Sequence, residues 1–118
     1  MKVNITAIRE PGNLEKERIV IRVDSSCNIG EFILLQTGFE NESVNTGIYE
    51  TFWFPDKSVR AGDLVVVYTK TGKSSEKKSN DATSHFFYMG KAVSIWNRNE
   101  QSAVLMHAPE WQSFQAVL

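Results

Sequence analysis

The stretch Arg18-Ile19-Val20-Ile21-Arg22-Val23-Asp24 decides the fold class of this chain. Ile19, Ile21 and Val23 stand at every second position, and successive side chains of an extended strand point to opposite faces. An amphipathic helix would instead repeat its apolar residues every three to four positions, and the stretch has no such stripe. It therefore predicts a half-buried β-strand.

The rest of the chain continues this pattern in short runs of β-branched and aromatic residues. Eight further strands are predicted, at residues 3–7, 31–36, 49–54, 64–69, 85–89, 92–97, 102–107 and 113–117. Residues 31–36 (EFILLQ) and 64–69 (LVVVYT) are apolar on both faces, which is typical of central strands covered on each side. Turn residues such as Pro11-Gly12 separate the runs. The pattern therefore predicts an all-β fold, either a sandwich or a closed barrel.

Two segments depart from the strand pattern. Residues 70–84 (KTGKSSEKKSNDATS) contain no aliphatic side chain larger than Ala82, so we expect a flexible polar loop without secondary structure. Residues 13–18 are the best helical candidate, with one or two turns and Asn13 as the N-cap. The same residues fit a polar turn, and the sequence leaves both alternatives open.

Length and composition indicate one globular domain. The 118 residues suffice for one hydrophobic core and are too few for two, so residues 1–118 are expected to form a single domain. The single cysteine, Cys27, cannot close an internal disulfide, so packing must supply the stability. Residues 1–13 lack the apolar stretch of a signal peptide, and no window is apolar enough to span a membrane. The expected location is therefore cytoplasmic, without membrane contact.

The charge is nearly balanced in total but divided along the chain. Thirteen basic and fourteen acidic residues give a net charge of −1, which excludes indiscriminate attraction to nucleic acid or anionic lipid. Residues 31–50 contain four glutamates and no basic residue, whereas residues 57–78 contain six basic and two acidic residues, a net charge of +4. The division predicts acidic and basic regions on the folded surface.

The aromatic residues are concentrated in the predicted strands. If both faces of each sheet are covered, these rings form core. If one face is open, Trp53, Phe87 and Trp111 are candidates for an exposed apolar platform that binds a protein partner. The sequence leaves both alternatives open.

The lysines of the polar segment support an alternative function. Lys70, Lys73, Lys77 and Lys78 lie next to the aromatic strands in sequence. Positive charge beside aromatic rings is the arrangement that single-stranded nucleic acid binders use to hold phosphates and stack bases. Nucleic-acid binding through these four lysines is therefore the second hypothesis.

Three residues carry the side chains that nucleophilic catalysis needs, namely Cys27, His85 and His107. A Cys-His dyad is geometrically possible, because each histidine lies at the end of a predicted strand and Cys27 lies in a turn-like segment. No local motif supports it, and three such residues do not supply the four ligands of a structural zinc site. We expect no metal and no cofactor, and small-ligand binding or catalysis stays a third hypothesis.

Three stretches occur in an order that resembles the lamin-tail domain, a compact immunoglobulin-like β-sandwich found at the end of nuclear lamins and as a module in many bacterial proteins. They are Glu31-Phe-Ile-Leu-Leu35, the segment FWFPDKSVRAGDLVVV at residues 52–67, and Val93-Ser-Ile-Trp-Asn97 followed by Ala103-Val-Leu105. The second is the most specific, since Pro55 ends one strand and Gly62 can adopt the positive φ of a turn before the next.

The resemblance implies an immunoglobulin-like β-sandwich of eight to nine short strands rather than an oligonucleotide-binding barrel. It also implies a non-enzymatic interaction or scaffolding module. Such a module would bind a protein partner, or a second copy of itself, through an aromatic face or an exposed edge strand.

Overall fold

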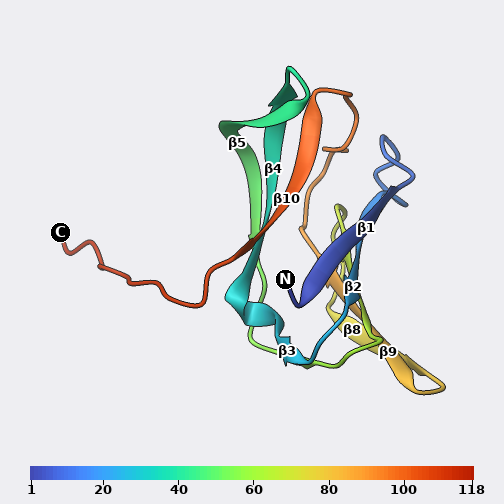
Figure 1. Ribbon diagram of the computed structural model, residues 1–118. Helices are drawn as coiled ribbons and strands as arrows, with labels where there is room; N and C mark the ends of the chain where they lie inside the picture. The colour runs from blue at the N-terminus through green and yellow to red at the C-terminus, as the bar shows by residue number, and fades with distance from the viewer.

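The computed structural model describes residues 1–118 and contains ten β-strands in two main sheets and one short sheet (Figure 1). The first sheet has five strands, in the order β1 (Val3–Arg9), β2 (Arg18–Val23), β7 (Leu64–Tyr68), β9 (Ala82–Tyr88) and β8 (Ser75–Ser79). The second has three strands, in the order β10 (Gln101–His107), β4 (Phe32–Glu40) and β5 (Ser43–Trp53). The short sheet pairs β3 (Cys27–Asn28) with β6 (Ser58–Val59), and a 3₁₀ turn, η1, spans Ile29–Glu31. The all-β prediction is confirmed as a sandwich, with ten strands.

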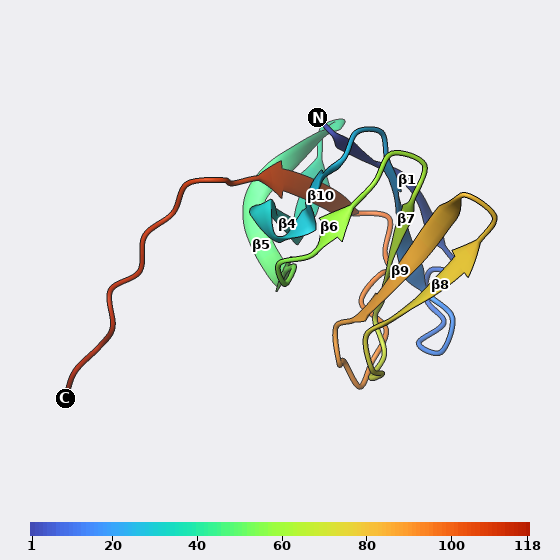
Figure 2. The same cartoon turned by 90° about the horizontal axis from the view of Figure 1, so that it is seen from below.

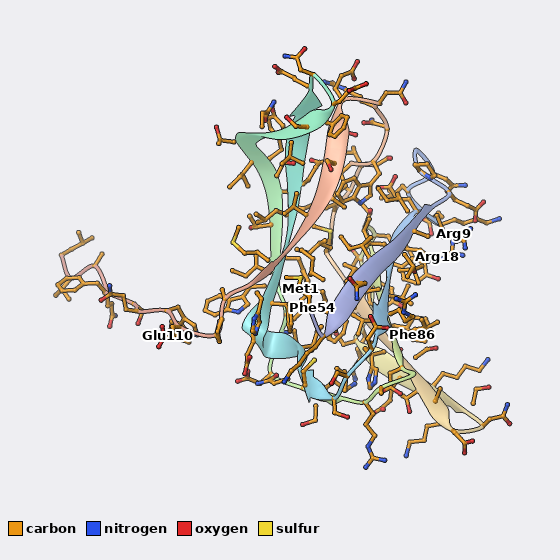
Figure 3. The ribbon with its side chains drawn as sticks, viewed as in Figure 1. Met1, Arg9, Arg18, Phe54, Phe86 and Glu110 are labelled. Carbon is orange, nitrogen blue, oxygen red and sulfur yellow. The ribbon has the colours of Figure 1, made fainter.

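The core lies between the five-stranded and three-stranded sheets. Seen from below, the two sheets face each other and β6 lies near one end of the gap (Figure 2). The side chains that alternate inward along β2, Ile19, Ile21 and Val23, are all at most 1% exposed. Phe54 lies between the sheets (Figure 3). Each buried side chain of this size stabilises the fold by about 1.5–3 kcal/mol, so the alternation read from the sequence locates the main stabilising surface.

The polar segment 70–84 contains secondary structure, so the prediction of a structureless loop is wrong. Residues 75–79 form β8, and residues 82–84 begin β9, with a two-residue turn at Asn80-Asp81 between them. Strand β9 pairs antiparallel with β8 and parallel with β7, and therefore lies between them. An edge strand is held by backbone hydrogen bonds and faces water, so its side chains need not be apolar. For this reason the alternation of apolar and polar residues did not predict β8 as a strand.

Two further segments differ from the predicted strands, and residues 13–18 adopt the polar turn, one of the two alternatives that the sequence left open. Residues 13–18 form a hydrogen-bonded turn, in which the Asn13 carbonyl accepts from the N–H groups of Lys16 and Glu17. Residues 92–97 are not a strand but link β9 to β10, and residues 113–117 are not paired with any strand. The 92–97 segment has strand-like composition because Ile95 and Trp96 are buried in the core.

A single buried carboxylate connects this linking segment to the five-stranded sheet. The Glu17 side chain is fully buried and accepts hydrogen bonds from Thr69 Oγ1 at 2.5 Å and Ile95 N at 2.9 Å. It also accepts from the backbone N–H groups of Gly12 and Trp96 and from the hydroxyl of Ser94. Burial raises the pKa of Glu17, but these hydrogen bonds outweigh it and hold that pKa below its ordinary value. The carboxylate therefore serves as a structural link between segments distant in sequence.

Candidate functional site

The outer face of the three-stranded sheet is apolar, and we call it the apolar face. Residues opposite each other on neighbouring strands share a face, so the strand register defines rows across the sheet. Four rows lie on the outer face: Trp53–Ile33–Met106, Thr51–Leu35–Val104, Ile48–Thr37–Ser102 and Val44–Phe39. None of these eleven residues is charged, and eight are apolar.

No second sheet packs on the apolar face, although Leu35 and Thr37 at its centre are only 7% and 4% exposed. Five of its side chains are more than a third exposed, namely Phe39 (38%), Val44 (49%), Ile48 (56%), Trp53 (49%) and Met106 (47%). Strand β4 is central, as predicted, but only one of its faces packs against the other sheet. In soluble proteins, adjoining exposed apolar side chains mark surfaces that bind partners.

Trp53 and Trp111, two of the three predicted platform residues, lie together at one end of the apolar face. Their rings pack edge to face with centroids 4.9 Å apart. The Trp53 indole N–H donates to the Gly30 carbonyl at 2.9 Å, which fixes its orientation. Trp111 is 64% exposed, so the pair presents apolar surface to solvent. The expectation of exposed aromatic rings therefore holds at these two positions.

Phe87, the third predicted platform residue, is 2% exposed and belongs to the core. Its ring packs against Phe52 and Phe54 at centroid distances of 6.1 and 5.4 Å. Because Phe87 alternates inward with His85 along β9, it cannot reach a surface that also contains Trp53. The expectation that Phe87 is exposed is wrong.

Residues 108–118 leave the body of the protein, and we call them the C-terminal arm (Figures 1 and 2). The first part of the arm is attached: the Ala108 N–H donates to the Glu31 carbonyl at 2.8 Å, and Trp111 packs on Trp53. Residues 112–118 have no secondary structure, and all are exposed. Phe114 and Leu118 are exposed in full. The arm therefore carries apolar side chains that have no partner within the chain.

The outer face of the five-stranded sheet has a different chemistry, and we call it the basic face. Its strands contain five basic residues and one acidic residue. Arg18 lies over the Tyr68 ring at 5.8 Å, and Tyr68 stacks on Tyr88 with centroids 5.4 Å apart. Figure 3 shows Arg9, Arg18 and Phe86 on this side of the molecule and Glu110 of the arm on the opposite side. The basic residues of this face come mostly from β1 and β2, outside the segment 57–78 whose positive charge the sequence indicated.

The four lysines of the nucleic-acid hypothesis do not form one patch. Lys70 lies 5.2 Å from the Tyr68 ring and 3.8 Å from a Glu15 carboxylate oxygen. Lys77 and Lys78 are adjacent on β8, so their side chains point to opposite sides of the sheet. Lys73 lies in the preceding connection and is exposed. The structure brings Lys70 to the aromatic rings and disperses the other three.

The three residues with catalytic potential lie in separate environments. Cys27 is partly buried, and burial raises the pKa of its thiol, which lowers the thiolate fraction at neutral pH. His107 contacts Glu31 at 3.0 Å and stacks on the Phe32 ring. No hydrogen bond joins Cys27 to either histidine. A surface pocket of about 580 Å³ is lined by residues 96–101 with Ile8, Pro11 and Gly12, and contains none of the three.

His85 forms a buried pair with a residue that the sequence did not single out, Asp63. The His85 Nε2 atom lies 2.9 Å from Asp63 Oδ2, and both side chains are at most 6% exposed. Asp63 also accepts from the backbone N–H groups of Arg60 and Thr83 at 3.0 Å. Burial raises the pKa of Asp63, but these hydrogen bonds outweigh it and lower that pKa overall. The pair braces the turn before β7 against β9 and is inaccessible to a substrate.

Four of the eleven residues of the apolar face, Thr37, Phe39, Val44 and Ile48, lie outside the predicted strands, because residues 37–48 were not predicted to be part of a strand. Val44 and Ile48 are separated by Asn45 and Gly47, residue types that favour turns. The period-two spacing of Val44, Thr46 and Ile48 is the signal that identifies the strand.

No three His, Cys, Asp or Glu side chains gather closely enough to hold a metal ion. No helix in the structure is long and apolar enough to cross a membrane. No protein-family model matches the chain, and the search of characterised proteins gives no match.

Proposed function

We propose that this chain is a non-enzymatic interaction module that binds a protein partner through the apolar face. The observation that carries the proposal is the set of four rows without a charged residue, five of whose apolar side chains are more than a third exposed. Burying apolar surface contributes about 25 cal/mol per Å², so covering this face supplies the main free energy of binding.

The edge of the same sheet supports the proposal. Strand β5 has eleven residues, contains Glu50 as its only charged residue, and is hydrogen-bonded on one side only. Among the other edge strands of the two main sheets, β8 has five residues, of which Glu76, Lys77 and Lys78 are charged, whereas β1 and β10 have seven residues each and only Arg9 is charged. Short charged edges resist pairing with other chains, whereas long uncharged edges permit it. The resemblance to the lamin-tail domain points the same way, as an analogy of fold.

Site-specific photo-crosslinking tests the proposal. A photoreactive residue is placed at Ile48 on the apolar face and, as the matched control, at Arg22 on the basic face. We expect protein adducts at position 48 in cells that produce the protein and few at position 22, with mass spectrometry identifying the attached chain. Equal adduct yields at the two positions, or none at position 48, would show that the apolar face is not the binding surface.

A second candidate function is nucleic-acid binding by the basic face, which the contacts of Arg18 and Lys70 with the Tyr68 ring favour. Exposed rings beside cations stack bases and neutralise phosphates. Fluorescence anisotropy with single-stranded oligonucleotides at low salt tests it, comparing the wild type with a variant in which Lys70, Lys73, Lys77 and Lys78 are serine. Affinity that falls steeply with salt and is lost in the variant supports this function, and affinity unchanged in the variant removes it.

A further inference from the structure

The C-terminal arm and the free edge of β5 lack partners in the same molecule. Residues 112–118 are extended, unpaired and exposed, and the sequence pattern of residues 113–117 is that of a strand. Phe114, Ala116 and Leu118 alternate with Ser113 and Gln115, which gives an extended arm one mostly apolar side. Strand β5 has no neighbour on its outer edge, and its pairing with β4 is regular from Glu50 to Trp53.

We propose that two copies of this chain exchange their arms, so that residues 112–118 of each copy add as a strand to the β5 edge of the other. The inference rests on the proposed function and names the partner as a second copy. Backbone hydrogen bonds provide the attachment, as in other cases where an extended segment joins a sheet edge.

The course of the arm favours exchange over folding back. The arm crosses the end of its own sheet, packs Trp111 on Trp53 at the end of β5, and then runs away from the body on that side (Figures 1 and 2). Since the arm runs outward and not alongside β5 (Figure 1), it would have to turn back toward the sheet to pair with its own β5 edge. A second copy placed beside the same edge receives it without such a reversal.

The dimensions and charges agree with this arrangement. Seven extended residues span about 23 Å, which is less than the roughly 36 Å of the eleven-residue β5. Residues 112–118 contain no charged side chain, and Glu50 of the acceptor edge already forms an ion pair with Lys91 at 2.7 Å. A reciprocal exchange is closed by a twofold axis and therefore stops at a dimer.

Sedimentation velocity over a concentration series tests the exchange. The wild type is compared with Gln115→Pro/Ala116→Pro, which removes two successive N–H donors, one of which must point at the acceptor strand in either register. The control Gln115→Ala keeps both donors. We expect a dimer for the wild type and the control, and a dimer dissociation constant raised at least about tenfold in the diproline variant. Because the arm lies outside the sandwich, circular dichroism should show all three chains equally folded.

Two outcomes would overturn the exchange. One is a wild type that stays monomeric up to about 1 mM. The other is a diproline variant that dimerises as strongly as the wild type. In either case, crosslinked adducts between position 48 and a different protein would still support the proposed interaction module. If position 48 gave no adducts, both the interaction module and the arm exchange would be contradicted. Adducts between position 48 and residues 112–118 of a second copy support both.

Discussion

The two outer faces of the sandwich have the same strand geometry and opposite chemistry. The basic face belongs to strands with five basic residues, and its rings are partly covered by Arg18 and Lys70. The apolar face belongs to strands with no Lys or Arg, and Trp111 of the C-terminal arm covers only one end of it. The difference teaches that the period of a strand determines which residues share a face. Whether the apolar side chains of that face stay exposed to water depends on long cationic side chains that can cover them.

The largest expected difference in the free energy of unfolding is between removing a core aromatic ring and removing a surface one. Phe87→Ala should lower the free energy of unfolding by about 3–5 kcal/mol, because it leaves a cavity beside Phe52 and Phe54. Trp53→Ala removes a half-exposed ring and should cost about 1 kcal/mol. Urea denaturation in the diproline background measures both without a contribution from association. Equal losses for the two variants would mean that the apolar face is part of the folding core.

The next largest effect on stability concerns Glu17, whose hydrogen bonds hold residues 92–97 against the five-stranded sheet. Glu17→Gln replaces an acceptor of several donors with an amide whose NH₂ group faces other N–H groups, and should cost about 3 kcal/mol. Glu15→Gln changes an exposed carboxylate in the same turn and should cost less than about 0.5 kcal/mol. If urea denaturation gives similar values for both variants, the carboxylate of Glu17 does not join the two regions.

Low pH should lower the stability of the protein by protonating carboxylates on the five-stranded side of the molecule. The two buried carboxylates, Glu17 and Asp63, both have folded pKa values below their ordinary values of 4.5 and 3.8. Each therefore contributes stability that is fully present above the unfolded pKa and is lost as the pH falls through the folded pKa. Unfolding free energy measured from pH 6 downward should decline below about pH 4.5. The decline should be shallower in Glu17→Gln, and an identical profile in that variant would contradict this origin of the acid sensitivity.

The smallest expected effect on stability is a difference between the hairpin turns of the two sheets. Glu42, between β4 and β5, has φ +65°, and Asn80, between β8 and β9, has φ +55°. Glycine adopts positive φ without steric cost, and asparagine tolerates it better than glutamate does. Glu42→Gly should therefore stabilise the protein by about 0.5 kcal/mol, and Asn80→Gly should change stability less. Thermal unfolding of both variants measures the difference, and the reverse ranking would show that side-chain contacts of Glu42 dominate.

Much of the fold followed from the sequence because burial in a β-sandwich repeats every two residues. Ile19, Ile21 and Val23 identified an inner face that the structure confirms. The same rule failed for residues 92–97, where buried Ile95 and Trp96 belong to a link whose N–H groups bond to Glu17 rather than to a strand. A contact 78 residues away along the chain leaves no local pattern.

The candidate site was only partly predictable. Trp53 and Trp111 were identified as possible surface rings, but composition does not distinguish them from Phe87. The distinction depends on which phase of the alternation faces the second sheet, and a one-residue shift in phase exchanges the two faces. Phe87 is in the inward phase with its neighbour Val67, whereas Trp53 is in the outward phase with Ile33.

The position of β9 between β7 and β8 has a consequence for the order of folding. The β8–β9 hairpin closes through a two-residue turn, so it can form within microseconds from neighbouring residues. The parallel contact of β9 with β7 requires a longer loop to close and is formed more slowly. We expect the hairpin to assemble first and to dock on β7 as a unit. Until it docks, β7 presents a temporary edge that can capture another chain, so this interval is when newly made protein is most prone to aggregate.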